Sequence, residues 1–170
     1  MARRGRRAHR ERMTSLDAAS VTAAGSTRSW WCLGARVTIH VGRADTGGLF
    51  TLVDLQAEPG FRLPRHVHRV EDEALLIRNG ALDVQCGDRT WTAEAGACVF
   101  LPQRVPHAFE VASREPLRAW QIIAPGGIED LLPKLGHPAP GPGLPPPHGW
   151  DVPGLVGIAA EHGIDILPWR

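Results

Sequence analysis

The 170-residue sequence predicts an all-β sandwich or barrel. The first observation is that apolar and β-branched residues occur in short runs, each ended by glycine, proline, asparagine or aspartate. The second is the regular spacing of these runs, which is typical of small sandwiches and barrels. The predicted strands are Arg36–Val41, Leu49–Leu55, Glu73–Ile77, Ala81–Cys86, Thr90–Ala93, Ala97–Leu101, His107–Val111 and Leu117–Ile123.

Two dipeptides between these runs predict hairpin turns. Asn79-Gly80 is the stronger signal, because both residues tolerate a positive φ and such pairs are common in two-residue hairpins. Gly87-Asp88 is the second signal, and it predicts a hairpin between the two strands that flank it. Both turns favour antiparallel pairing of strands that are neighbours in the sequence.

The sequence changes character after residue 126. Apolar residues recur at three- and four-residue spacing up to Leu135, which predicts a short amphipathic helix over 127–135 that Pro133 weakens near its end. The stretch Pro133–Pro147 is rich in proline and predicts an extended surface segment. A last helix is expected over Asp151–His162, with the aspartate as its N-cap.

These patterns divide the chain into three regions. Residues 1–28 are expected to form a disordered arginine-rich leader, because the first twelve residues hold six arginines against one glutamate and blocks of like charge are usually disordered. Residues 29–126 form the predicted barrel, and residues 127–170 a C-terminal extension whose helices and proline-rich segment pack on it. The net charge is only +1, so the part outside the leader is mildly acidic and no nucleic-acid partner is expected.

The expected location is the cytoplasm. The residues that follow the arginines are polar, so they do not resemble an export signal, and no apolar run is long enough to span a membrane. The three cysteines, Cys32, Cys86 and Cys98, have no CxxC spacing. They predict free thiols in a reducing compartment rather than a disulfide scaffold.

Three histidines and a glutamate form the pattern that points to chemistry. His66 and His68 are two residues apart, so on a strand both imidazoles face the same side. Glu73 follows after a charged turn, and His107 opens a later strand. Three imidazoles and one carboxylate suit a divalent transition metal such as iron, manganese, nickel, cobalt or zinc. They suit Mg²⁺ or Ca²⁺ poorly, since those ions prefer oxygen ligands.

The spacing of these residues resembles the two motifs of the cupin superfamily. The first motif corresponds to Gly60, His66, His68, Glu73 and Gly80, and the second to Gly96, Pro102 and His107. The resemblance implies a single jelly-roll barrel with a short helical and extended C-terminal extension. It also implies that His66, His68, Glu73 and His107 hold one divalent transition metal.

Several positions qualify this resemblance. Arg104 stands where the second motif often has glycine, and Val111 where it can have asparagine. Glu71 and Asp72 are rival carboxylates. We prefer Glu73, because Asp72 would project to the opposite face of a regular strand and Glu71 breaks the spacing to Gly80.

The sequence also suggests a substrate pocket. Phe50 and Leu52 share one face of their strand, and Trp120 and Ile122 share one face of theirs. If these faces point inward, they make a largely apolar pocket beside the metal for a small-molecule substrate. Core packing is the alternative for each of these four residues.

Three hypotheses for the function remain open. The segment after the second motif also resembles small quercetin dioxygenase-like cupins, which implies that Glu73 takes the proton of a metal-bound phenol or enediol before dioxygen attacks. The second hypothesis is a non-oxidative cyclase, isomerase, dehydratase or lyase, and the third is a sensor or binding protein. We also expect a homodimer, with the strand around Trp30–Val41 crossing to the partner.

Overall fold

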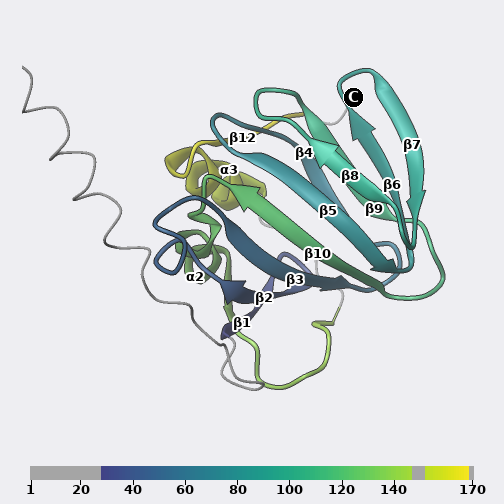
Figure 1. Cartoon of the computed structure of the whole chain (residues 1–170), viewed down its shortest axis with the longest axis horizontal. Helices are drawn as coiled ribbons and strands as arrows, with labels where there is room; N and C mark the ends of the chain where they lie inside the picture. Colours follow the sequence, from purple (N-terminus) through teal and green to yellow (C-terminus); the bar gives the residue numbers. More distant parts are fainter. Residues whose placement is uncertain (1–27, 147–151, 169–170) are drawn as a thin grey trace, which may run out of the picture.

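The computed structural model describes residues 28–146 and 152–168, which fold into two antiparallel sheets that face each other (Figure 1). The predicted leader lies outside these residues except for Arg28, and so does Asp151. The seven-stranded sheet has the order β11 (Gly136–Pro138), β1 (Arg28–Cys32), β2 (Ala35–Val41), β3 (Thr51–Ala57), β10 (Leu117–Ala124), β5 (Asp72–Asn79) and β8 (Cys98–Leu101). The five-stranded sheet has the order β12 (Ile164–Ile166), β4 (Arg62–His68), β9 (His107–Val111), β6 (Ala81–Cys86) and β7 (Arg89–Glu94).

The core lies between the inner faces of the two sheets. Along β3 and β10 buried residues alternate with more exposed ones, so every second side chain enters the core. Leu75 and Ile77 of β5 meet Leu82 and Phe109 of the opposite sheet in one apolar cluster. The all-β jelly-roll fold predicted from the sequence is therefore confirmed, and each of the eight predicted strands ends within two residues of an observed one.

The predicted hairpin at Asn79-Gly80 is wrong in one respect. The chain does turn there, and Gly80 has a φ of 79°. However, β5 pairs with β10 and β8, whereas β6 pairs with β7 and β9, so the turn carries the chain from one sheet to the other. Turn residues specify a reversal of direction, but packing between the sheets decides which strands pair. The hairpin at Gly87-Asp88 is confirmed, with Cys86 opposite Arg89.

The helix predicted over 127–135 is interrupted. It consists of a 3-10 turn, η1 (Ile128–Asp130), and a single helical turn, α2 (Leu132–Leu135). Pro133 stands at the start of α2, where its missing N–H costs least. It therefore permits a new short helix but cannot continue the preceding one.

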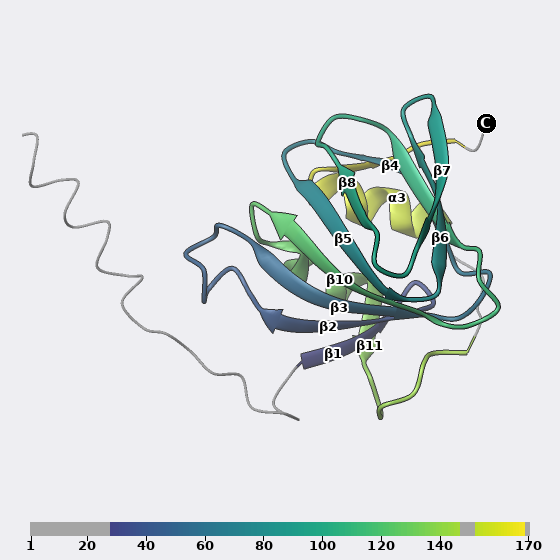
Figure 2. The ribbon, with the colours of Figure 1, turned by 45° about the vertical axis from the view of Figure 1, so that its right-hand side comes forward.

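The last part of the chain returns to the barrel. Part of the proline-rich stretch forms β11, which pairs with β1. Helix α3 (Val152–Glu161) lies beside α2, and in Figure 2 it is seen behind the opening between the two sheets. Strand β12 then pairs with β4, so that Ile164 lies opposite His68 and Ile166 opposite His66. Within the described ranges, no helix is long and apolar enough to cross a membrane.

Two further expectations concern cysteines and assembly. Cys32, Cys86 and Cys98 are all free thiols, and burial raises the pKa of Cys32 to about 12, so its sulfur stays protonated. Strands β1 and β2 pair with each other, and β11 and β3 flank them in the same chain. The crossing of this region to a partner subunit stays a prediction.

Candidate metal centre

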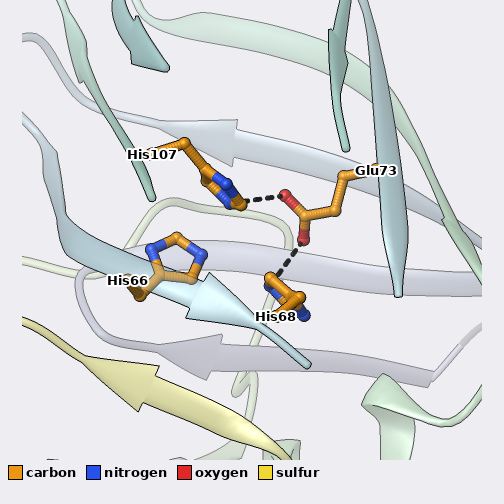
Figure 3. Close-up of side chains that lie close together, drawn as sticks. All are labelled: His66, His68, Glu73 and His107. Carbon is orange, nitrogen blue, oxygen red and sulfur yellow. Dashed lines mark ion pairs between the residues drawn. The ribbon is translucent and has the colours of Figure 1, made fainter. Parts of the chain in front are cut away.

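Three strands from both sheets bring the predicted ligands together. His66 and His68 lie on β4 and point to the same side, as expected for positions two apart on a strand. His107 is the first residue of β9, and it lies directly opposite His66 in the ladder. Glu73, the second residue of β5, approaches from the opposite sheet (Figure 3).

The four side chains form one buried cluster. One ligand atom from each residue can be chosen so that all four atoms lie within 4.8 Å of one another. The exposed fraction is at most 4% for each of the four residues. The convergence of these side chains is as the sequence predicted.

Backbone carbonyls orient two of the imidazoles. His66 Nδ1 lies 2.7 Å from the carbonyl oxygen of Pro64, and His107 Nδ1 lies 2.9 Å from that of Val105. A carbonyl oxygen only accepts hydrogen bonds, so each Nδ1 carries the proton and donates. Each Nε2 therefore keeps its lone pair, which is the state that binds a metal.

The carboxylate of Glu73 lies at the centre of the cluster. Its Oε1 is 3.2 Å from His68 Nε2 and accepts a hydrogen bond of 3.2 Å from Gln121 Nε2. Its Oε2 lies 3.6 Å from His107 Nε2, and neither of these two buried atoms has a hydrogen-bond partner. Buried polar atoms without partners are costly. A cation bound between these two acceptors would satisfy both, so the donor set fits a metal.

Burial and mutual contacts shift the pKa values of the cluster. Burial would raise the pKa of Glu73, but its close contacts with His107 and His68 outweigh this effect and hold the pKa well below its usual range. Burial, with the nearby His107, lowers the pKa of His66 to about 3. Burial would also lower the pKa of His68, but hydrogen bonds to Glu71 and Glu73 outweigh it and raise the value to about 9.

The rival carboxylates serve other purposes. Glu71 Oε2 lies 3.3 Å from His68 Nδ1, so it can fix the orientation of that ring. Asp72 points away from the cluster, as predicted from its parity, and its Oδ1 accepts a hydrogen bond of 2.8 Å from the backbone N–H of Gln103. It thereby ties β5 to the turn before His107. Neither residue belongs to the cluster of four.

Arg104 occupies a backbone conformation that glycine favours. Its φ is 62°, in the left-handed region, which explains why glycine would suit this position in the turn. Its backbone N–H donates a hydrogen bond of 2.7 Å to the carbonyl oxygen of His68. The turn before His107 is thus connected to the strand that carries the other two histidines, and the departure from the motif leaves the cluster intact.

A mostly apolar cavity of about 120 Å³ adjoins the cluster. This is roughly tenfold the volume that one buried water needs. His66, His68 and Glu73 line the cavity together with Gln121. Its apolar walls come from both sheets and from the C-terminal elements, and they include Val53, Leu55, Phe61, Phe109, Ile123, Leu131, Leu155, Ala159 and Ile164.

The sequence-based prediction of the pocket residues was wrong. Phe50, Leu52, Trp120 and Ile122 do not line this cavity. On β3 the buried positions are Thr51, Val53, Leu55 and Ala57, and on β10 they include Ala119, Gln121 and Ile123, so the predicted faces are the outer ones. On β10 both faces carry apolar residues, so alternation alone could not decide which face turns inward. On β3 a signal was present, since the polar Asp54 and Gln56 share the face of Leu52.

Sequence reasoning also missed Gln121. This side chain is 8% exposed, lines the cavity and contacts Glu73. A signal was present, since Gln121 is a lone amide inside the apolar run Leu117–Ile123. A buried amide needs a partner, and the partner that the fold provides is the carboxylate. The C-terminal walls of the cavity had no comparable signal.

Comparisons with known proteins agree with this architecture. The family described as "Cupin domain" matches residues 54–127. The quercetin 2,3-dioxygenase of Bacillus subtilis (strain 168) is 26% identical over 101 residues, which cover 59% of this chain and 30% of that protein. The chain therefore spans less than a third of the length of this relative.

Solved structures show the same fold at low sequence identity. KdgF from Halomonas sp. has a TM-score of 0.57 and 14% identity, covering 66% of this chain and 99% of that one. A predicted oxalate decarboxylase from Thermotoga maritima has a TM-score of 0.54 and 16% identity, covering 62% and 98%. The cupin domain of Schizosaccharomyces pombe Cnp3 has a TM-score of 0.50 and 12% identity, covering 56% and 68%. At these identities the likeness shows the fold alone.

Proposed function

We propose that this chain, whose residues 54–127 match the cupin domain family, is a metal-dependent dioxygenase acting on an aromatic or enolisable small molecule. One observation carries the proposal: a buried cluster of three histidines and one glutamate borders an apolar cavity. A closed structural site would more often be built from cysteine thiolates. The relationship to a quercetin dioxygenase supports oxidative chemistry in particular.

The metal would be held by His66, His68, Glu73 and His107. Three imidazoles and one carboxylate suit iron, manganese, nickel, cobalt or zinc. When bound, such an ion supplies Lewis-acid and, for the redox-active metals, electron-transfer chemistry between a substrate hydroxyl and dioxygen.

Glu73 is the group that moves a proton. Oε2 has no hydrogen-bond partner and is the atom left to hold the cation. The proton of a substrate hydroxyl would therefore be taken at Oε1, which accepts one hydrogen bond from Gln121 Nε2 and has a second lone pair. The low pKa of Glu73 keeps the carboxylate ionised at neutral pH. Phe61 and Phe109, with ring centroids 6.4 Å apart, offer apolar surface to an aromatic substrate and exclude water.

The test begins with protein purified without added metal. Elemental analysis identifies the resident ion, and an oxygen electrode follows turnover with flavonols, catechols and enediols. We expect uptake of one dioxygen per substrate and loss of both metal and uptake in His66→Ala. His137→Ala is the matched control, because His137 is exposed and lies outside the cluster.

Two outcomes would contradict the proposal and favour another function. Conversion of a substrate without oxygen uptake would indicate a cyclase, isomerase, dehydratase or lyase that uses the same site. Tight binding of a ligand that is never converted would indicate a sensor or binding protein.

A further inference from the structure

The chemistry of the cavity walls carries information about the substrate. Apart from His66, His68, Glu73 and the weakly polar thiol of Cys32, Gln121 is the one side chain with a polar end group among the described residues that line the cavity. Its amide nitrogen already donates to Glu73 Oε1 at 3.2 Å. No lysine, arginine or aspartate from the described part of the chain lines the cavity.

The cavity walls that lie away from the metal-ligand side chains are built from apolar residues. Val53, Leu55 and Ile123 come from the seven-stranded sheet, and Phe61 and Phe109 come from the barrel wall opposite. The remaining wall is built by the C-terminal elements, through Leu131, Leu132, Leu135, Leu155, Ala159, Ile164 and Ile166. The part of the chain outside the matched cupin segment therefore contributes a large share of the cavity surface.

A charged or hydroxylated group placed among these side chains would lose its hydration without gaining a partner. Burial of an unpaired hydroxyl is unfavourable, and burial of an unpaired carboxylate is far more so. A dicarboxylate or a sugar acid could place one end on a metal, but its other end would meet only apolar side chains. An alkyl or aryl group at that end would instead gain from leaving water.

We propose that this site accepts a neutral molecule with one polar, metal-binding end and an otherwise apolar body, such as an alkyl-substituted catechol or enol. The proposal rests on the metal-binding function proposed above, and it excludes small dicarboxylates and polyhydroxylated sugars. Helix α3 sets the length of the body that fits. Leu155 and Ala159, four residues apart on one face of this helix, both line the cavity.

Three catechols that differ at one position test the chemical preference. Protein loaded with zinc, which has no redox chemistry, is titrated calorimetrically without oxygen against 4-ethylcatechol, 3,4-dihydroxybenzyl alcohol and 3,4-dihydroxybenzoate. We expect the alcohol to bind at least ~10-fold and the benzoate at least ~100-fold more weakly than the ethyl compound. Metal-free protein is titrated in parallel, and the zinc content is measured before and after.

Each outcome bears on one claim. Equal affinities for the three compounds would overturn the proposal, and so would a failure of all three to bind zinc-loaded protein. Binding in the expected order without oxygen uptake by iron- or manganese-loaded protein would leave it intact and contradict the dioxygenase function instead. Binding in the expected order to metal-free protein would contradict the role of the metal-binding end.

A pair of variants on α3 tests the length of the site. Leu155→Ala enlarges the cavity, whereas Val156→Ala changes a neighbouring residue that is 41% exposed and does not line it. Because each buried methylene is worth about fourfold in affinity and butyl has two more than ethyl, we expect Leu155→Ala to improve binding of 4-butylcatechol relative to 4-ethylcatechol by up to about sixteenfold. Val156→Ala should leave the ratio unchanged. The same ratio of butylcatechol to ethylcatechol affinity in Leu155→Ala as in the unchanged protein would show that α3 does not limit the length of the bound molecule, provided that thermal melting shows the variant to be folded.

Discussion

Both faces of the seven-stranded sheet carry apolar residues, but the two faces differ in how deeply these residues are buried. On the inner face Val53 and Leu75 are fully buried, and Glu73 and Gln121 of the same face belong to the metal centre. On the outer face Leu76 is 45% exposed, although it is adjacent in sequence to Leu75. Equally apolar residues on one strand therefore contribute differently, because only one face meets the opposite sheet.

A row of apolar residues crosses the outer face. Ile122 lies opposite Leu52 on one side and Ala74 on the other, and Ala74 lies opposite Phe100. Phe100 is 59% exposed and Ile122 is 43% exposed. Scattered exposed apolar residues are common, but a row across four neighbouring strands marks a surface that can interact. The contrast between the faces can be tested by substitution.

The largest expected effect is on stability. Leu75→Ala should lower the free energy of unfolding by about 2–5 kcal/mol, since it removes a fully buried side chain and leaves a cavity. Leu76→Ala, the same change one residue later, should cost less than about 1 kcal/mol. Urea denaturation of both variants measures the difference. Equal costs would show that the outer face is buried in the protein in solution.

The next effect is on chemistry at the inner face. Glu73→Gln keeps the shape of the side chain and a carbonyl oxygen but removes its basicity. We expect turnover to fall at least ~10²-fold at equal measured metal content, which is the usual scale for losing a general base. Glu94→Gln, on exposed strand β7, is the control and should be unaffected. Full activity of metal-loaded Glu73→Gln would show that Glu73 is a ligand only.

A smaller effect is expected from pH on the metal-free protein. The pKa of His68 is raised from 6.5 to about 9, so its contacts stabilise the fold fully below pH 6.5 and are lost as pH rises towards 9. The pKa of His66 is lowered to about 3, so below pH 6.5 the unfolded chain binds a proton at this histidine that the folded protein does not. The free energy of unfolding therefore falls as pH falls from 6.5 towards 3. Thermal melting should therefore show a maximum of stability near pH 6.5.

The variant Glu71→Gln sharpens this measurement. It replaces the charged acceptor at His68 Nδ1, which contributes to the raised pKa, with a neutral amide, so the decline in stability above pH 6.5 should become shallower. Bound metal should abolish that decline, because it competes with the proton on His68. A decline of the same slope in all three samples would locate the titrating group elsewhere.

The smallest effect is expected on the outer face. Ile122→Ser should change the free energy of unfolding by less than about 1 kcal/mol, and Phe100→Ser should do the same. A larger cost that grows with protein concentration would show that a second copy covers this face. Sedimentation then tests the predicted homodimer directly, since an 18.5 kDa species across micromolar concentrations would contradict it.

Some features of this protein followed from the sequence because they are local. The spacing of His66 and His68 on a strand fixes their common face, and turn residues mark where most strands end. The alternation in β6 is also informative, since Leu82 and Val84 are apolar whereas Asp83 and Gln85 are polar, and the two apolar residues are the buried ones. The four clustered side chains were identified without the fold, because the spacing of Glu73 and His107 relative to the glycines and to the His66–His68 pair resembles the two cupin motifs.

The tertiary structure alone decided the rest. Both faces of β10 carry apolar residues, so only the packing of the second sheet determines that Gln121, rather than Ile122, faces the cavity. The turn at Asn79-Gly80 is local, but whether the next strand pairs or changes sheets depends on long-range contacts. The same holds for α3 and β12, which return from the end of the chain to close the cavity. A sequence period records how side chains alternate, and it contains no information about which side another part of the chain will cover.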